Sequence, residues 1–383
     1  MKRAIVIILD SLGVGHAPDA QQFSDEGANT LGTILNEYPS IHIPHLKKLG
    51  LFHIEGVDAK SDVDPIGIYG RLFSVSKGKD TTIGHWELMG VPVKTPFPTY
   101  PEGFPQEVLQ SFMEETGRGV LCNRPYSGTE VIRDYFHKQR ESGDWIVYTS
   151  SDSVFQIAAH EELIPIEELY EACRKARRIL TGPHAVARVI ARPYIGESGR
   201  LVRTANRRDY SLTPFSPTVL DILKEAGKEV IGIGKIEDIF NGSGITRAVH
   251  TKNNDDGMKK TIELLKNNFE GLLFTNLVDF DAMYGHRRDV FGYKQALEAF
   301  DLQLGELIES LREDDLLLLT ADHGNDPGFR GTDHTREMVP LLIYRQGIQP
   351  RNFGTRSGFY HVGETVAQHL GVRGTGFGEA LQK

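Results

Sequence analysis

The sequence predicts an α/β fold built on a mainly parallel sheet flanked by helices, with a second domain inserted into it. Three apolar runs, at residues 4–9, 272–278 and 316–320, have the length and aliphatic content of strands buried in a parallel sheet. An aspartate follows each run within two residues. Stretches with helical spacing lie between the strand candidates, and a length of 383 residues exceeds what one hydrophobic core usually organises.

The remaining elements of this sheet follow from the same patterns. Residues 230–233 and 340–344 are expected to be further strands, and residues 217–226, 256–267 and 293–311 are expected to be helices. Ligands of such open folds bind beyond the carboxyl ends of the strands. Asp10, Asp279 or Asp281, and Asp322 would then lie along one edge of the sheet.

A separate domain is expected where the composition changes. Residues 95–101 are dense in proline, and two further prolines, Pro214 and Pro217, mark the return of the chain. Between them lie strand candidates at 145–149 and 186–191 and a helix candidate at 166–180. We therefore expect a discontinuous catalytic core of residues 1–94 and 217–383, with an inserted α+β cap domain at residues 95–216.

Composition narrows the class of protein. The chain is 39% apolar and 25% charged, as is ordinary for a globular protein, and its net charge of -9 disfavours nucleic acid as a partner. Cys122 and Cys173 form no pattern of a disulfide framework or a zinc–thiolate site, which favours a reducing compartment. The first apolar run is too short for a signal peptide or a membrane span. We expect a cytoplasmic protein with no membrane association and no obligate protein partner.

Two local patterns indicate a metal centre. The sequence from Thr320 to Asp326, TADHGND, places Asp322 and His323 at a strand end, where they offer an oxygen and an imidazole to one metal. His334, on a glycine-containing loop, can turn back to another metal. Asp281 and His286 are five residues apart, so that a single strand-to-loop turn could direct both at one ion. With Asp10, the chain supplies ligands for two divalent cations.

Each of these residues has a simpler interpretation when taken alone. An aspartate at a strand end, such as Asp10, is more often a helix cap, and a single histidine, such as His334, is more often a satisfied polar side chain. Three aspartates and three histidines at successive strand ends would, however, be destabilising if left unpaired in one cleft of low dielectric. Bound cations would resolve that conflict.

Two neighbouring metals suit in-line displacement at phosphorus, which requires a nucleophile. Thr81, in the sequence SKGKDTTIGHWE at residues 76–87, is the candidate, because coordination to a metal would favour its alkoxide. The residues after Thr81 read as the start of a helix whose exposed amides could hold a phosphate. The alternative is that Thr81 is only a helix N-cap, with Ile83 and Trp86 packing inward.

Long motifs along nearly the whole chain resemble those of the bacterial phosphopentomutase family, within the alkaline phosphatase superfamily. These motifs are residues 7–15, 79–87, 101–105, 148–154, 188–193, 276–281 and 320–326. The resemblance implies a metal core split by a cap domain. It also implies an intramolecular phosphotransferase of the isomerase class, acting on a small phosphosugar in nucleoside catabolism.

The resemblance further assigns roles to particular residues. It implies that Asp10, Thr81, Asp322 and His323 surround one manganese ion, that Asp281, His286 and His334 surround the other, and that Thr81 is phosphorylated. Ribose 1-phosphate and ribose 5-phosphate, or their 2-deoxyribose counterparts, would interconvert through a pentose bisphosphate. Glucose 1,6-bisphosphate or a similar sugar bisphosphate would prime the cycle. Oxygen and nitrogen ligands of this kind also accept other divalent ions.

Substrate contacts are implied by matched positions. They are Ser150, Asp152, Arg188 and Arg203 of the cap and Lys235 of the core, facing the sugar or its distal phosphate. Arginine is the expected partner of a phosphate, and aspartate of ribose hydroxyls. The alternative for Arg188 and Arg203 is ion pairing at the surface.

Two other functions remain open. Phosphatases, phosphodiesterases and cofactor-independent phosphoglycerate mutases share such a metal constellation, so a metal-dependent phosphomonoesterase is the first alternative. A cap that excludes water favours a mutase, because the phosphoenzyme must survive while the sugar reorients. The second alternative is a catalytically silent metal-binding or phosphosugar-sensing protein, although all seven implied metal and nucleophile positions are filled.

Overall fold

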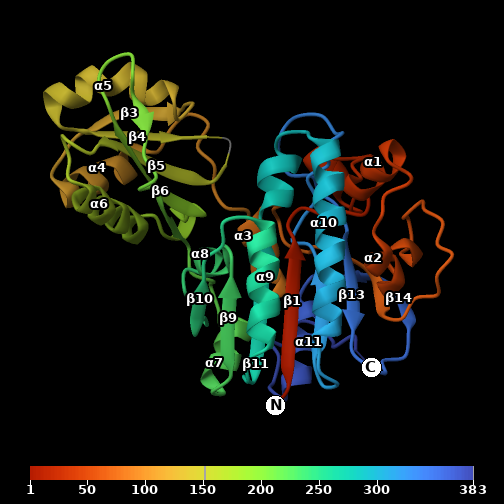
Figure 1. Ribbon diagram of the computed structural model, residues 1–383. Coiled ribbons are helices and arrows are strands. Elements are labelled where there is room, and N and C mark those ends of the chain that lie inside the picture. The colour runs from red at the N-terminus through yellow and green to blue at the C-terminus, as the bar shows by residue number, and fades with distance from the viewer. Residues whose placement is uncertain (151, 383) are drawn as a thin grey trace. The chain divides into compact units, whose positions relative to one another are not determined.

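The computed structural model describes residues 1–150 and 152–382. The chain divides into two compact units, one of Met1–Thr95 with Pro214–Lys383 and one of Pro96–Thr213. The sequence had suggested residues 95–216 for the inserted segment. Both units combine helices with a sheet (Figure 1), and the predicted α/β class is confirmed.

The sheet of the first unit has eight strands within the described residues, of which only β13 runs against its neighbours. In spatial order they are β10 (Arg247–Val249), β9 (Glu229–Ile233), β11 (Gly271–Leu277), β1 (Arg3–Leu9), β12 (Leu316–Thr320), β13 (Val339–Tyr344), β2 (Ile68–Phe73) and β14 (Arg351–Ser357). The mainly parallel sheet predicted from the apolar runs is thus confirmed.

The centre of this sheet explains why its strands read as continuous apolar runs. Every residue of β1 is buried, and β1 pairs in parallel with β11 on one side and β12 on the other. A parallel strand covered on both faces has no solvent face, so its sequence shows no alternation. The register aligns Leu9 with Leu277 and Ile8 with Thr320. The chain therefore leaves all three strands at the same edge.

Helices cover the sheet of the first unit. In Figure 1, α9 (Asn254–Leu265) and α10 (Val290–Glu309) lie in front of it, and α11 (His361–Leu370) contacts β1. The predicted helices at 217–226, 256–267 and 293–311 correspond to α7 (Val219–Glu225), α9 and α10. Side-chain caps fix all three starts: Thr218 begins α7 with a capping box, Asn253 accepts a hydrogen bond from the Asp256 amide in α9, and Asp289 accepts one from the Gly292 amide in α10.

Shorter elements complete the first unit. They are η1 (Ala20–Phe23), α1 (Thr30–Glu37), α2 (Pro44–Leu49), η2 (Leu51–His53), α3 (Thr81–Leu88), α8 (Ile236–Ile239) and a π-helical turn, η4 (Phe280–Gly285). Among these, only the start of α3 was predicted from the sequence. Across the described residues, none of the helices combines the length and the apolar character needed to cross a membrane.

The inserted unit has its own mixed sheet. Its strands lie in the order β3 (Val120–Pro125), β4 (Trp145–Thr149), β5 (Val154–His160), β6 (Arg188–Ile195) and β7 (Val202–Arg203), and β8 (Arg208–Ser211) also pairs with β6. The helices are α4 (Gln106–Thr116), α5 (Glu130–Ser142), α6 (Ile166–Ile179) and η3 (Gly182–His184). The sequence-predicted strands at 145–149 and 186–191 and helix at 166–180 correspond to β4, β6 and α6.

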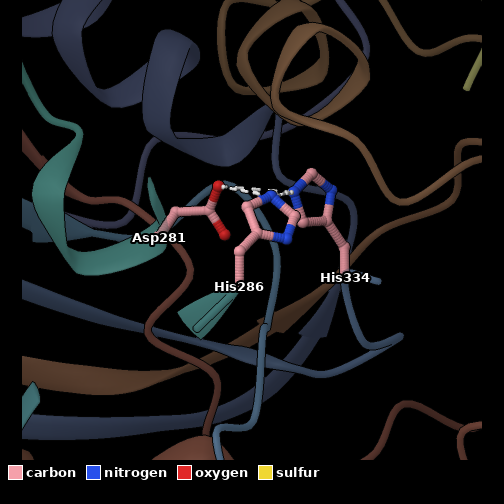
Figure 2. Close-up of side chains that lie close together, drawn as sticks. All are labelled: Asp281, His286 and His334. Carbon is pink, nitrogen blue, oxygen red and sulfur yellow. Dashed lines mark hydrogen bonds and ion pairs between the residues drawn. The ribbon is translucent and has the colours of Figure 1, made fainter. Parts of the chain in front are cut away.

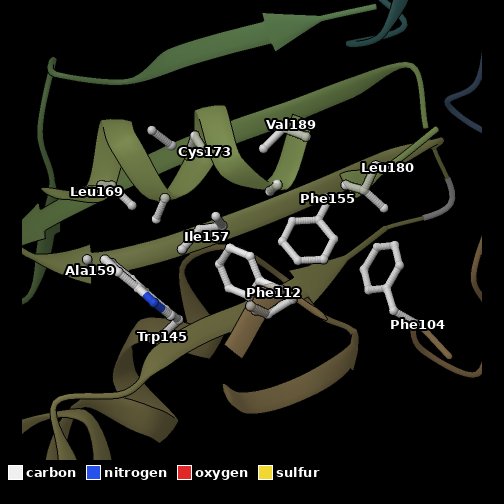
Figure 3. Close-up of a cluster of buried hydrophobic side chains, with 14 of the residues drawn as sticks. Phe104, Phe112, Trp145, Phe155, Ile157, Ala159, Leu169, Cys173, Leu180 and Val189 are labelled. Carbon is white, nitrogen blue, oxygen red and sulfur yellow. The ribbon is translucent and has the colours of Figure 1, made fainter. Parts of the chain in front are cut away.

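Two apolar clusters stabilise the inserted unit, one on each face of its sheet. Strand β4 shows the division most clearly, because Trp145 and Val147 belong to one cluster while Ile146 and Tyr148 belong to the other. Figure 3 shows the first cluster, with Trp145 beside aromatic side chains and residues of α6. Successive residues of a strand point to opposite faces, so a strand buried on both faces needs apolar residues throughout. The unit therefore has a hydrophobic core of its own.

Candidate metal centre and sugar-phosphate pocket

Three aspartates gather where the central strands of the first unit end. Asp10 directly follows β1, Asp322 lies two residues after β12, and Asp281 lies in η4, which follows β11. Asp279, which the sequence left as an alternative to Asp281, instead accepts a hydrogen bond from the Asn254 amide at 2.9 Å. It holds the start of α9 and is outside the ligand groups found here.

The first group consists of Asp10, Asp322 and His323, all buried, with one potential ligand atom of each lying within 4.8 Å of the others. The His323 Nε2 atom is 3.4 Å from Asp10 Oδ1 and 3.4 Å from Asp322 Oδ2. Among the described residues, Asp10 Oδ1 has no hydrogen-bond donor. A buried carboxylate oxygen without a donor is costly, so this position suits a cation.

The charges within the first group also favour a bound cation. Burial, followed by repulsion from Asp322 and Asp281, raises the pKa of Asp10 well above its usual range. Burial acts to lower the pKa of His323, but the neighbouring charges of Asp322 and Asp10 outweigh it and raise the pKa to about 9. In the metal-free protein, bound protons therefore supply the positive charge that a cation would otherwise bring to the aspartates.

The second group consists of Asp281, His286 and His334 (Figure 2). Asp281 Oδ2 lies 3.1 Å from His286 Nε2 and 3.4 Å from His334 Nε2. The two Nε2 atoms lie 3.1 Å from each other. Burial acts to raise the pKa of Asp281, but the charge of His334 and hydrogen bonds from both imidazoles hold that pKa well below its usual range.

A π-helical turn brings Asp281 and His286 together. The sequence predicted a strand-to-loop turn at this point, and the structure has η4 instead, in which the His286 amide donates to the Asp281 carbonyl at 2.9 Å. That bond joins residues five apart and places their side chains on one face. Single π turns occur frequently at functional sites.

Backbone carbonyls orient all three imidazoles. The Nδ1 atoms of His323, His286 and His334 lie 3.0, 2.8 and 3.0 Å from the carbonyl oxygens of Gly324, Thr332 and Lys79, respectively. When each Nδ1–H donates to its carbonyl, the Nε2 lone pair is left for a cation. The rings of His323 and His334 stack with their centroids 3.9 Å apart, so the two groups adjoin each other.

Thr81 lies next to the first group. It is the first residue of α3, and its Oγ1 is 3.3 Å from His323 Nε2. The alternative that Thr81 is the N-cap is wrong, because Asp80 holds that position and accepts from the Ile83 amide at 3.1 Å. Ile83 and Trp86 do pack inward. The Thr81 hydroxyl thus lies at a helix N-terminus, the end that favours negative charge.

Three polar residues that the sequence analysis did not single out contact the aspartates. The amide of Asn276 donates to Asp10 at 2.9 Å, and that of Asn325 donates to Asp281 at 2.7 Å. His85, one turn after Thr81, has Nδ1 at 2.9 Å from the Thr81 carbonyl and 3.1 Å from Asp322 Oδ2. All three lie within the motifs quoted above, which was the only signal in the sequence. Such outer contacts fix the orientation of ligands.

The inserted unit contains a polar pocket with a volume of about 220 Å³. Four predicted substrate residues, Ser150, Asp152, Arg188 and Arg203, line it together. The fifth, Lys235, belongs to the other unit, where it is the N-cap residue of α8, and it does not line this pocket. The structure thus groups the four predicted residues of the insert in one pocket.

Further residues of the pocket were missed by the sequence analysis. Arg192, Arg207 and Tyr148 also line it. Tyr148 is 1% exposed, and its hydroxyl has no hydrogen-bond partner among the described residues. Burial, and then repulsion from Arg207, lowers the pKa of Arg192. Several guanidinium groups around a buried hydroxyl without a partner are suited to an anionic ligand.

The alternative of ion pairing is correct in part for one of the predicted arginines. Arg188 lies 3.6 Å from Asp209, which Arg207 also contacts at 2.7 Å. One carboxylate cannot neutralise two guanidinium groups, so a net positive charge remains. Pairing with Asp209 therefore does not remove the preference of the pocket for an anion.

The sequence matches the family described as the Metalloenzyme superfamily over residues 2–374. Phosphopentomutase from Alkaliphilus metalliredigens is 53% identical over 100% of this chain and 99% of its own length. Phosphopentomutase from Deinococcus radiodurans is 54% identical over 98% of each chain. Phosphopentomutase from Caldanaerobacter subterraneus subsp. tengcongensis is 55% identical over 97% of this chain and 95% of its own.

Solved structures share the fold at much lower identity. Phosphoglycerate mutase from Leishmania mexicana has a TM-score of 0.53 and 12% identity, with 100% of this chain and 97% of that chain covered. The PH0037 protein from Pyrococcus horikoshii has a TM-score of 0.51 and 17% identity, with 97% of both chains covered. The sequence relatives at full length decide the family: the chain belongs to the phosphopentomutase family, within the metalloenzyme superfamily, as its motifs indicated.

Proposed function

We propose that this enzyme interconverts ribose 1-phosphate and ribose 5-phosphate, and likewise the 2-deoxyribose phosphates, at a centre of two divalent metals. The observation that carries the proposal is the meeting of two ligand groups beside the Thr81 hydroxyl. The chain's identity of 53% with a full-length phosphopentomutase selects this reaction among those that such a centre can catalyse.

The proposed ligands divide between two ions. Asp10, Thr81, Asp322 and His323 would hold one, and Asp281, His286 and His334 would hold the other. The Asp10 oxygen without a hydrogen-bond donor among the described residues and the carbonyl-oriented imidazoles fit hard or borderline divalent cations such as Mn²⁺. When bound, two such cations would stabilise the charge on the attacking and leaving oxygens of an in-line displacement.

Thr81 is the proposed carrier of the phosphate. A sugar bisphosphate such as glucose 1,6-bisphosphate would first transfer one phosphoryl group to its hydroxyl oxygen. The phosphothreonine would then donate that group to the free 1- or 5-oxygen of a pentose phosphate, which gives a pentose bisphosphate and free Thr81. Return of the other phosphoryl group to Thr81 completes an isomerisation without net release of phosphate. The α3 N-terminus would favour the negative charge on the transferred group.

Proton release upon metal binding is the first testable consequence. His323, with its pKa raised to about 9, is protonated at neutral pH in the metal-free protein, and a metal at Nε2 must displace that proton. The apparent affinity for Mn²⁺ should therefore rise with pH up to about 9. Calorimetric titration of metal-free protein in buffers of different ionisation enthalpy measures the protons released, and release of none would contradict the proposed role of His323.

The pocket of the inserted unit is the proposed binding site for the phosphosugar. Arg188 and Arg203, assisted by Arg192 and Arg207, would contact the phosphate, and Ser150 and Asp152 the sugar hydroxyls. Lys235 is proposed as a further contact from the resemblance alone. Tyr148 could donate its unpartnered hydroxyl to the same ligand.

Two variants test this pocket. Arg203→Met should raise the KM for ribose 5-phosphate about ten- to a hundredfold, because one charged hydrogen bond is lost. Arg200→Met, an exposed neighbour outside the pocket, should leave KM unchanged. Tyr148→Phe should also raise KM, yet it should not lower the melting temperature, because the hydroxyl has no hydrogen-bond partner within residues 1–150 and 152–382. A loss of melting temperature with normal KM would show that the hydroxyl serves the fold instead.

The proposed reaction is tested by incubating the Mn²⁺-loaded protein with ribose 1-phosphate and a trace of glucose 1,6-bisphosphate. Formation of ribose 5-phosphate with no inorganic phosphate is the expected result. Release of inorganic phosphate in step with consumption of the pentose phosphate would identify a phosphomonoesterase. Binding without turnover would identify a sensing protein.

A further inference from the structure

Arg288 has an unusual set of contacts close to the second ligand group. Its guanidinium donates to five acceptors: the Gly331 carbonyl at 2.6 Å, the Gly285 carbonyl at 3.0 Å, Asn325 Oδ1 at 2.6 Å, the Asp326 carbonyl at 2.8 Å and the Asp333 carbonyl at 3.1 Å. Its backbone φ of 57° lies in the left-handed region, which residues other than glycine rarely adopt. Strain of this kind persists only where the surroundings fix the residue.

The acceptors come from three separate segments, and each segment contributes to the second group. Gly285 ends η4, which carries Asp281 and precedes His286. Asn325 donates its amide to Asp281 while its Oδ1 accepts from Arg288. Asp333 immediately precedes His334. One side chain therefore joins every part of the chain from which this group is built.

The two ligand groups differ in what holds them in place. Asp10, Asp322 and His323 are buried at the ends of paired strands, so the register of the sheet fixes them. His334 is held differently: Thr335, which follows it, is bridged to Gly324, but the segment at residues 330–333 before it is exposed and belongs to no strand or helix. The hydrogen bonds from Arg288 to the carbonyls of Gly331 and Asp333 tie this segment to η4 and the loop after β12.

We propose that Arg288 is the positioning residue that holds His286 and His334 where a single cation can bind both, and that the affinity of this second cation depends on it. The inference rests on the proposed metal centre. A planar guanidinium with donors directed to several sides can reach all five acceptors, with the two hydrogens of Nη1 shared among three of them, which the ammonium of lysine cannot do. Contacts of this outer kind typically change metal affinity by about ten- to a hundredfold.

The test uses Arg288→Lys, which keeps the charge, and Arg288→Asn, which keeps a residue tolerant of the left-handed conformation. Arg287→Lys, at the exposed neighbouring position, is the control. Mn²⁺ is titrated into each metal-free protein, with the melting temperature of the metal-free form measured alongside. The wild type should show two binding events, and a wild type that binds no Mn²⁺ would refute the metal centre itself.

Both Arg288 variants should bind one Mn²⁺ ion with wild-type affinity and the other with an affinity lowered by about ten- to a hundredfold. The control, Arg287→Lys, should bind both ions as the wild type does. Combining Arg288→Lys with Asp281→Asn should weaken binding no further than Asp281→Asn alone, because both act on the same ion. Wild-type affinity for both ions in either variant would overturn the inference. An equal loss of affinity for both ions, together with a lower melting temperature of the metal-free variant, would also overturn the inference. That result would show that Arg288 has a general role in the fold.

Discussion

Thr81→Ala is expected to reduce kcat by at least about a thousandfold, because it removes the oxygen proposed to accept the phosphoryl group. The fold should be retained, since Thr81 is partly exposed and Asp80, which caps α3, is unchanged. Loss of one proposed metal ligand should lower the affinity for one of the two ions modestly. Saturating Mn²⁺ should therefore restore metal binding and leave turnover absent.

Intact-mass analysis after incubation with glucose 1,6-bisphosphate measures this directly. Wild-type protein should gain the mass of one phosphoryl group, and Thr81→Ala should gain none. Thr82→Ala is the matched control, because Thr82 is the next residue of the same helix and is buried. A phosphoryl group found on another residue, or full activity of Thr81→Ala, would remove Thr81 from its proposed role.

Asp10→Asn should change activity and stability in opposite directions. Turnover should fall by at least about a thousandfold with the loss of a proposed ligand to the first cation. The metal-free protein, by contrast, should melt at a higher temperature. The pKa of Asp10 is raised in the folded state, so at neutral pH its ionisation opposes folding, and an amide removes both the buried charge and its repulsion of Asp322.

Thermal melts with chelator and with Mn²⁺ separate these effects. Wild-type protein should be strongly stabilised by Mn²⁺, whereas Asp10→Asn should be stabilised much less because it binds the ion weakly. Asp279→Asn is the control, since that aspartate lies at the same edge of the sheet but caps α9 through the Asn254 amide. A metal-free Asp10→Asn protein that melts well below the wild type would show that the carboxylate serves the fold, and the proposed cation site would lose its main support.

The sequence was most informative where chemistry and pattern are local. Three buried strands were predicted from their apolar runs, and the aspartates at their ends could be named because parallel strands direct those ends to one edge. Predictions were weaker for β2 and β14, which the sequence analysis did not assign. β2 alternates between buried and partly exposed residues, and β14 is largely exposed, so neither reads as a continuous apolar run.

Contacts between segments far apart in the chain could not be predicted from the sequence. Nothing in the spacing of Asp281 and His286 distinguishes a π turn from an ordinary loop, since the distinction depends on one backbone hydrogen bond. The contacts of Arg288 could not be predicted either, because its acceptors lie up to 45 residues away. Tyr148 was predicted only as part of a buried strand. The structure places it in a pocket lined by arginines, where its hydroxyl has no partner in the described part of the chain.

The sequence by itself determined the buried strands at the centre of the sheet, the family and the identity of the side chains that could hold cations, because these depend on residue type, hydrophobic period and long motifs. Tertiary structure decided which aspartate joins each group, how each imidazole is turned, and how His334 is held near His286. Those features arise from hydrogen bonds between segments far apart in the chain. Their geometry is set by packing and register, for which a linear pattern carries no signal.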